Sequence, residues 1–377
     1  MSRVKFLDLK AQYPLIKDEI MRKFDDILDR TGFVSGKYVT EFEKKFAEYV
    51  GVKHAIACTS GTTALYLPLL AKGIGPGDEV IMPVNTFIAT AEAVSLLGAK
   101  PVFVDIDEAT CNMDVEKIEA AITDKTVGII PVHLYGQCVD MDRVSEIADK
   151  AGLWVIEDAC QAHGAAYRGR NAGSMSDAAA FSFYPGKNLG SWGEGGAVVT
   201  DNDELAEKMR LLVGHGSIKK YYHKVVGGNF RMTEFQGAVL DTKIEFLEQW
   251  NEGRRKNAHL YMQELANVEG LRLPHVEEFN KPVWHLFVVR VGNREAFMDA
   301  LKEREIDCGI HYPFPLHLCE AYAHLGYKEG DFPVAEKVQK EIVSLPMYAE
   351  LSRDDIVRVG ECVREILVES SVATVSQ

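Results

Sequence analysis

The sequence predicts an α/β protein with a mostly parallel central sheet, followed by a smaller α+β domain. Between about His54 and Asp201, short β-branched runs alternate with segments whose apolar residues recur at helical spacing. The runs are almost continuously apolar, which is typical of parallel strands buried on both faces. After Asp201 the alternation ends. With 377 residues, 47% of them hydrophobic, the chain is long enough for one large core and one smaller core.

Seven apolar runs are expected to form the strands of the central sheet. They are 54–58, 79–82, 101–105, 127–132, 154–157, 178–183 and 197–200. Glycine or proline ends most of the segments between them, which favours helices there. These helices are expected at 63–72, 89–97, 115–122 and 142–151.

The second half of the chain has a different pattern. We expect residues 1–250 to form a large domain with an N-terminal segment, and residues 251–377 to form a small α+β domain. A heptad-like, highly charged helix over about 233–265 is long enough to link them. The tail 369–377 lacks a helical stripe and is expected to fray. Other expected elements are helices at 204–212, 294–303 and 335–341 and a strand at 284–290.

Charge and cysteine content exclude several classes of function. The 42 basic and 56 acidic residues give a formal charge of −14, which opposes binding to nucleic acid or to an anionic membrane. The first ten residues contain no apolar targeting segment, and no run of eighteen apolar residues occurs. The seven cysteines are scattered without metal-ligand spacing, so we expect no metal site and a reducing cytoplasm. They are Cys58, Cys111, Cys138, Cys160, Cys308, Cys319 and Cys362.

Lys187 and Asp158 together favour covalent carbonyl chemistry. Lys187 lies in the aromatic and glycine-rich stretch Phe181-Ser-Phe-Tyr-Pro-Gly-Lys187. A lysine can form a Schiff base when its amine is held away from bulk water, although an isolated lysine is usually a solvated surface charge. Asp158 ends a buried strand, where it can face a ligand cation, cap a helix or form a structural ion pair. A carboxylate there would keep a pyridine nitrogen protonated, which suits an electron-withdrawing cofactor.

Four other segments are candidates for a binding site. Ser60-Gly-Thr-Thr-Ala64 follows a strand and opens a helix, so it is either a phosphate-binding turn or an ordinary capped turn. No P-loop, dinucleotide-binding glycine motif or nucleophile elbow is found. Phe87 follows another strand and would either stack on a flat ligand or pack in the core. The turn-rich clusters 227–233 and 309–317 either line a site or are solvated connections.

Taken together, these motifs resemble the DegT/DnrJ/EryC1/StrS family of nucleotide-sugar aminotransferases. The motifs Ser-Gly-Thr, Thr-Phe-x-Ala-Thr, Glu-Asp-Ala-x-Gln, Ser-Phe-x-x-x-Lys-Asn and Asn-x-Arg-Met-Thr-Glu occur in the family's order. The similarity runs from Phe6 to Tyr348. It implies the aspartate aminotransferase type of fold, called fold type I, with pyridoxal 5'-phosphate as the cofactor and pyridoxamine 5'-phosphate formed during the reaction. It also implies a homodimer with shared active sites.

The resemblance implies a role for each matching residue. Lys187 would form the Schiff base and move protons, Asp158 would hold the pyridine nitrogen, and Gln161 would contact the ring hydroxyl. The remaining cofactor contacts would be stacking by Phe87 and phosphate binding by Gly61, Thr62, Ser182 and, from a second subunit, Asn229. Substrate contacts would come from Tyr184, Arg231, His311, Tyr312 and His317.

The family resemblance also implies a reaction. Glutamate would donate its amino group to the cofactor, and a nucleotide-linked keto sugar would receive it. The segment 184–190 looks most like members that aminate C3 of dTDP-linked 3-keto-6-deoxyhexoses. A UDP-linked 3-keto uronic acid or a 4-keto sugar remains an alternative, because 134–138 is shared with uronic acid enzymes. Cys160, Trp192 and Glu194 depart from the family pattern, and Trp192 is expected to face the sugar.

Two other classes of function compete with sugar transamination. A non-catalytic regulator would keep the fold and sense pyridoxal phosphate or a sugar nucleotide, usually with a DNA-binding segment. No basic helix-turn-helix extension is visible in this acidic chain. A lyase or desulphurase of the same fold would act on an amino acid without needing a sugar.

Overall fold

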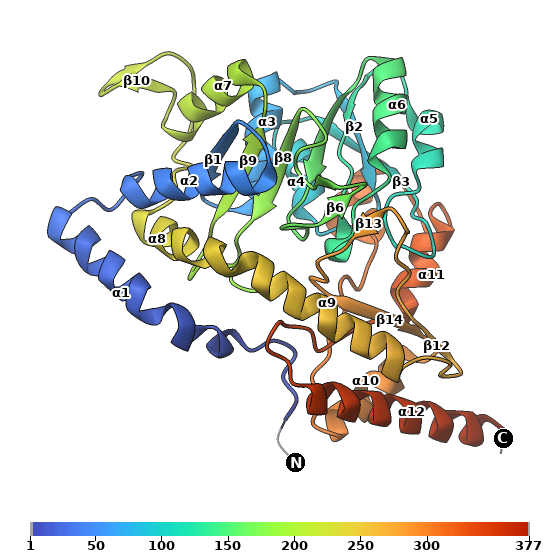
Figure 1. Cartoon of the computed structure of the whole chain (residues 1–377). Coiled ribbons are helices and arrows are strands. Elements are labelled where there is room, and N and C mark those ends of the chain that lie inside the picture. Colours follow the sequence, from blue (N-terminus) through green and yellow to red (C-terminus); the bar gives the residue numbers. More distant parts are fainter. Residues whose placement is uncertain (1–2, 376–377) are drawn as a thin grey trace.

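The centre of the molecule is a seven-stranded sheet, seen here in a computed structural model that describes residues 3–375 (Figure 1). Its strand order is β1-β9-β8-β5-β4-β2-β3. Five neighbouring strands, from β8 to β3, pair in parallel, whereas β9 runs antiparallel to both β1 and β8. The predicted mostly parallel sheet is therefore confirmed. The strands are β1 (His54–Cys58), β2 (Glu79–Pro83), β3 (Lys100–Val104), β4 (Thr126–Ile129), β5 (Trp154–Asp158), β8 (Ala178–Ser182) and β9 (Gly196–Thr200).

Helices cover both faces of this sheet, and strand alternation explains why. In β8, Ala178 and Ala180 belong to one buried cluster, while Ala179 and Phe181 belong to the other. The first cluster lies under α3 (Gly61–Lys72), α4 (Ala89–Ser95) and α7 (Asp203–Val213). The second lies under α2 (Lys37–Val50), α5 (Ile118–Ala121) and α6 (Met141–Ala151). A sheet buried on both faces is what the apolar runs predict.

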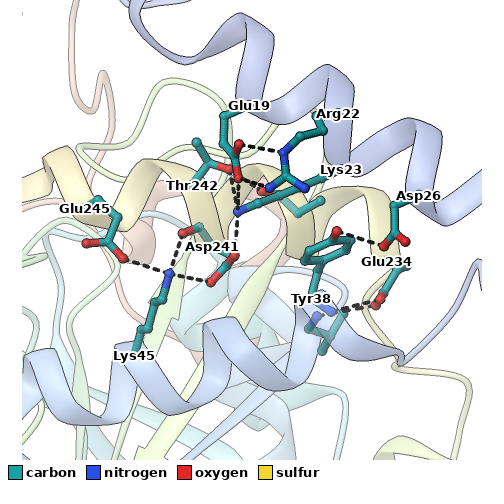
Figure 2. A network of polar contacts seen from close by, with 12 residues as sticks. Glu19, Arg22, Lys23, Asp26, Tyr38, Lys45, Glu234, Asp241, Thr242 and Glu245 are labelled. Carbon is teal, nitrogen blue, oxygen red and sulfur yellow. Dashed lines mark hydrogen bonds and ion pairs between the residues drawn. The ribbon is translucent and has the colours of Figure 1, made fainter.

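Two helices lie within the first 50 residues, where the sequence led us to expect none. Helix α1 (Tyr13–Arg30) buries Ile16, Ile20 and Ile27, a spacing that could have predicted it. Polar contacts join α1 and α2 to α8 (Glu234–Lys243) (Figure 2). Asp241 lies 2.6 Å from Lys23 Nζ and 2.8 Å from Lys45 Nζ. The N-terminal segment is thus fixed to the body of the protein.

A second, three-stranded sheet orders the C-terminal part of the chain. It consists of β12 (Leu271–Arg272), β14 (Phe287–Val291) and β15 (Ile342–Leu345), paired antiparallel. Val288 on β14 joins the core of the large sheet, whereas Phe287 and Val289 join a separate core. That core also takes residues from α9 (Leu247–Glu264), α10 (Arg294–Glu303) and α12 (Arg353–Val375). The division at residue 250 stays a prediction.

Short elements complete the described chain. Hairpin β10 (Ser217–Lys219) and β11 (Tyr222–His223) extends beyond α7 at the upper left of Figure 1. A small sheet joins β6 (Ala166–Tyr167) to β7 (Arg170–Asn171) and β13 (Asn280–Lys281), and α11 (Pro333–Glu341) precedes β15. Among residues 3–375, no helix combines the length and apolar character needed to cross a bilayer.

Three sequence-based expectations about helices need correction. The long helix over 233–265 is divided by a 3₁₀ turn at Ile244–Phe246, which separates the almost fully buried α8 from the half-solvated α9. The helix over 115–122 begins as a 3₁₀ turn and ends at Ala121. The tail was expected to fray from 369, but α12 continues to Val375, because extending an anchored helix costs little. Residues 376–377 of that tail lie outside the described residues.

Candidate active site

A cavity of about 660 Å³ lies at the carboxyl ends of β5 and β8, where open parallel sheets bind ligands. It brings together segments at the carboxyl ends of five strands, β1, β2, β4, β5 and β8, and a loop of the C-terminal part. Ten of the predicted site residues line it: Gly61, Thr62, Phe87, Asp158, Gln161, Ser182, Tyr184, Lys187, His311 and Tyr312. Residues far apart in the sequence therefore share one site.

Lys187 lies in the turn after β8 and lines this cavity. Its backbone N–H donates to Tyr184 O at 2.9 Å, which closes the turn. Burial lowers the pKa of the Lys187 amine, and the attraction of Cys160 and Asp158 only partly opposes this. A lowered pKa raises the fraction of neutral amine, which is the form that attacks a carbonyl carbon. The pocket expected around this lysine is present.

Asp158 is the last residue of β5 and is 5% exposed. Its Oδ2 accepts a hydrogen bond from Thr90 Oγ1 at 2.7 Å, and its Oδ1 accepts one from Cys160 N at 3.1 Å. No salt bridge within residues 3–375 uses this carboxylate. A structural ion pair, one of the alternatives raised by the sequence, is therefore not its role within this chain. A buried carboxylate without a cation suits a cationic ligand group.

The turn after β1 combines a helix cap with free backbone amides. Ser60 Oγ accepts a hydrogen bond from Thr63 N at 3.2 Å and so caps α3. Within residues 3–375, no hydrogen bond involves the N–H groups of Gly61 and Thr62. A side chain at Gly61 would place its Cβ 2.6 Å from Ser182 Cβ, so only glycine fits. The helix N-terminus thus leaves donors for an anion beside Ser182.

The loop that contains His311 and Tyr312 closes the cavity from the C-terminal part. The ring of Phe87, which is 52% exposed, lies 5.5 Å from the ring of Tyr312. Gln161 Nε2 donates to Tyr312 Oη at 3.0 Å, and its Oε1 accepts from Tyr135 N at 2.7 Å. His311 Nδ1 lies 2.8 Å from Ser344 Oγ. The exposed ring of Phe87 and the hydrogen-bonded side-chain amide of Gln161 thus both face the cavity.

Three predicted site residues do not line the cavity of this chain. Asn229 and Arg231 lie on the surface, where Arg231 Nε donates to Asn229 Oδ1 at 3.1 Å. His317 is 2% exposed, and its Nε2 lies 3.0 Å from Glu336 Oε1. Trp192, expected to face the sugar, packs instead against Tyr13 on α1 at 5.9 Å between ring centroids.

Some residues that line the cavity were not identified from the sequence. They are Phe6, Leu7, Thr86, Thr90, Arg254, His285 and Met347 among others. Arg254 donates to three backbone oxygens, of Trp284, His285 and Met347, at 3.1 to 3.2 Å. In the sequence it belongs to a charge-rich helix and looks solvated. His285 lies near the start of the apolar run 284–290. A single polar residue at that end of an expected strand was a signal that could have identified it as a site residue.

Comparisons with known proteins agree with this geometry. A "Pleiotropic regulatory protein" of Geobacillus stearothermophilus is 46% identical over 96% of this chain and 98% of its own. The "dTDP-3-amino-3,4,6-trideoxy-alpha-D-glucose transaminase" of Streptomyces venezuelae is 46% identical over 96% of each chain. A crystal structure of S. venezuelae DesV in complex with a ketimine intermediate superposes with a TM-score of 0.96, at 46% identity, over 97% of this chain and 99% of that one.

The family model of these enzymes matches nearly the whole chain. The match covers residues 14–364, which includes every predicted site residue. The solved relatives have the same α/β architecture around a mostly parallel sheet. The fold, the lysine-containing cavity and the sequence similarity thus agree, and the chain is a member of the DegT/DnrJ/EryC1/StrS aminotransferase family.

Proposed function

We propose that this protein transfers the amino group of glutamate to C3 of a dTDP-linked 3-keto-6-deoxyhexose, with pyridoxal 5'-phosphate as its cofactor. One observation carries the proposal: Lys187, Asp158 and the free N-terminus of α3 line a single cavity. The 46% identity to a dTDP-3-amino-sugar transaminase supports the choice of sugar. The segment after Lys187, which resembles 3-aminating members, supports the choice of carbon.

The residues of the cavity fit this cofactor. The unused amides of Gly61 and Thr62, with Ser182 nearby, suit its phosphate. Asp158 forms no salt bridge within the described chain and suits the protonated pyridine nitrogen. Phe87 presents an exposed ring for stacking, and Gln161 lies within reach of the cavity. When bound, the cofactor accepts electrons from the substrate's α-carbon and so eases removal of a proton there.

The chain's own residues then bind, orient and move protons. Lys187 would hold the cofactor, and its amine, once replaced there by the amine of the substrate, would carry a proton from the substrate's α-carbon to the carbon that receives it. Its lowered pKa keeps the amine able to accept that proton. Thr90 and Cys160 donate hydrogen bonds to Asp158 and so hold its carboxylate in place. Tyr184, His311 and Tyr312 line the same cavity and would contact the sugar.

A homodimer with shared active sites is part of the proposal. Asn229 is paired with Gly214 at the base of the β10–β11 hairpin, outside the cavity. The same hairpin region exposes Ile218, Tyr221 and Val226, the last being 92% exposed. Large exposed apolar side chains on one projecting segment favour contact with another chain. In a second subunit Asn229 and Arg231 would complete the phosphate and sugar contacts.

We also place the protein in the cytoplasm, since all seven cysteines are free thiols. A second candidate function is a sensor without catalysis, which the relative named as a regulatory protein favours. Against it stands Lys187, since a sensor has no need for a proton carrier with a lowered pKa. UDP-linked 3-keto uronic acids and 4-keto sugars remain alternative acceptors.

The test separates these functions in two steps. Glutamate is first added to the enzyme loaded with pyridoxal phosphate, and loss of the absorption of the aldehyde form is followed. dTDP-linked and UDP-linked 3-keto and 4-keto sugars are then added one at a time, and return of that absorption identifies the acceptor. We expect return with the dTDP-linked 3-keto sugar. Return with a 4-keto sugar alone would reject the position, and binding without any amino transfer would favour the sensor.

A further inference from the structure

A chain of buried amides begins at the residue after Lys187. Asn188 is 3% exposed, and its Nδ2 donates to Val283 O and to Asn251 Oδ1, both at 2.9 Å. Asn251 is fully buried, and its Nδ2 donates to His163 O at 2.8 Å. At the other end, Asn188 Oδ1 lies 3.2 Å from Nδ1 of His285. The side-chain amides of Asn188 and Asn251 therefore connect the segment after Lys187 with the segments that contain Val283 and His163.

The direction of every bond in this chain is fixed by backbone carbonyls. A carbonyl oxygen only accepts, so the groups that face Val283 O and His163 O must be the NH₂ groups of Asn188 and Asn251. Asn188 therefore turns its own side-chain oxygen toward His285. Because that oxygen also only accepts, His285 Nδ1 must carry the hydrogen. In the neutral ring, Nε2 is then left with a lone pair.

This lone pair belongs to a ring that lines the cavity with Lys187. Within residues 3–375, no hydrogen bond uses His285 Nε2, and the atom is not sealed in the core. Burial, followed by the positive charges of Lys187 and Arg254, holds the pKa of His285 well below its usual value. The ring is thus a neutral acceptor, whereas a lysine ammonium is a donor only.

We propose that Asn188 and Asn251 form an amide relay that sets the tautomer of His285, and that His285 Nε2 accepts a hydrogen bond from Lys187 whenever its amine carries a proton. The second part rests on the proposed transaminase function. No bond is formed or broken in the relay: the proton stays on Lys187 Nζ, and His285 orients the ammonium and stabilises it. His285 lines the cavity with Lys187 and would contact the reacting amine there, while Asn188 and Asn251 are positioning residues.

His163 provides an internal reference for this tautomer. Its Nε2 lies 2.9 Å from the backbone oxygen of Ser182, so Nε2 must donate, and its Nδ1 has no partner among the described residues. Burial lowers the pKa of His163 to about 3, so this ring is neutral as well. The two buried histidines should therefore carry their hydrogens on opposite nitrogens.

Nitrogen NMR of the apo-protein, labelled with ¹⁵N-histidine, tests the relay without any reaction. His285 and His163 are assigned by the signals lost in His285→Phe and His163→Phe. We expect His285 to be hydrogenated on Nδ1 and His163 on Nε2 near neutral pH. Asn188→Leu should shift His285 to the Nε2–H form, whereas Asn257→Leu, the matched control on the same helix as Asn251, should not. A native His285 that is hydrogenated on Nε2, or doubly protonated, overturns the relay.

Half-reactions test the partnership with Lys187. His285→Phe should slow the reactions with glutamate and with the keto sugar by about 10- to 100-fold each, the range expected for a hydrogen bond to a charged group. Asn188→Asp keeps a side-chain oxygen that can accept a hydrogen bond from His285 Nδ1–H, so it should slow both half-reactions less than His285→Phe does. It also replaces Asn188→Leu if that variant does not fold. Unchanged rates of both half-reactions in His285→Phe overturn the partnership. Slowing of the sugar half-reaction alone also overturns it, because His285 Nε2 would then bind a sugar hydroxyl. If the native protein transfers no amino group, the proposed function and this partnership fail, while the NMR result still decides the relay.

Discussion

Two parts of the proposed site differ in how they are held in place. One is the wall of the cavity formed by strand ends, here called the strand-end wall, and the other is the segment that carries Asn229. Asp158 and Ser182 end the buried strands β5 and β8, so the sheet itself sets their positions. Segment 214–231 instead forms an exposed hairpin that leaves the body of the chain (Figure 1). Asp158 and Lys187, to which we assign the chemistry, line the cavity of one chain. The segment would gain its proposed role only when a second subunit meets it.

The largest effect is expected at the strand-end wall, from Lys187→Ala. Without the amine, the cofactor has no covalent anchor and the substrate carbon has no proton carrier. The protein loaded with pyridoxal phosphate should lose the visible absorption of the lysine Schiff base, and turnover should fall to background. Spectra and a coupled assay for 2-oxoglutarate measure both. A native-like spectrum in the variant would show that another residue holds the cofactor.

Asp158→Asn should have the next largest effect, because it removes the charge and keeps the shape. The amide oxygen can still accept a hydrogen bond from Cys160 N, and the NH₂ group can donate to Thr90 Oγ1, whose hydroxyl can turn to Thr86, so folding should be little affected. The pyridine nitrogen would lose its anionic partner, and we expect kcat to fall by at least about 100-fold. Thr90→Val, which leaves the carboxylate, should cost less. A kcat for Asp158→Asn within about threefold of the native value would remove this role from Asp158.

Mixing inactive variants tests whether the exposed segment completes a neighbouring site. Lys187→Ala disables the wall of its own chain, and Asn229→Ala with Arg231→Ala disables the segment. If sites are shared, a mixed dimer contains one site with both native parts. Random assembly of equal amounts should then restore roughly a quarter of the native activity. Purified mixed dimers, separated by two affinity tags, provide the measurement and should show roughly half of the native activity, because one of their two sites is intact. Activity that stays at the level of the separate variants would contradict shared sites.

The same contrast explains what the sequence could and could not predict. Strand ends are marked by apolar runs, so the sequence alone could group Asp158, Ser60 and Lys187 into one site. It could not add Arg254, because the contacts of this side chain with three backbone oxygens depend on how the C-terminal part packs. His317 shares a turn-rich cluster with His311, yet it turns inward to Glu336. Spacing along a loop does not determine which side chain faces a cavity.

The smallest effect concerns the point where the exposed segment joins the body. Glu234 is fully buried, and its carboxylate accepts hydrogen bonds from Gly36 N at 2.8 Å, Tyr38 N at 2.9 Å and Val39 N at 3.3 Å. It thereby caps α2 (Figure 2), and the preceding residue, Thr233, pairs with Val34. Glu234→Ala leaves three buried donors unsatisfied and should lower the free energy of unfolding in urea by about 3 kcal/mol.

A matched control distinguishes this cap from a general loss of charge. Glu245→Ala removes a carboxylate from the same network, but its ion pair with Lys45 is exposed and should contribute less than about 0.5 kcal/mol. If the cap also holds the segment in place, Glu234→Ala should raise KM for the keto sugar while the absorption due to Lys187 stays unchanged. Equal losses of stability in the two variants would contradict the cap. A changed absorption would mean that the strand-end wall depends on the segment, and the two regions would then not be separable.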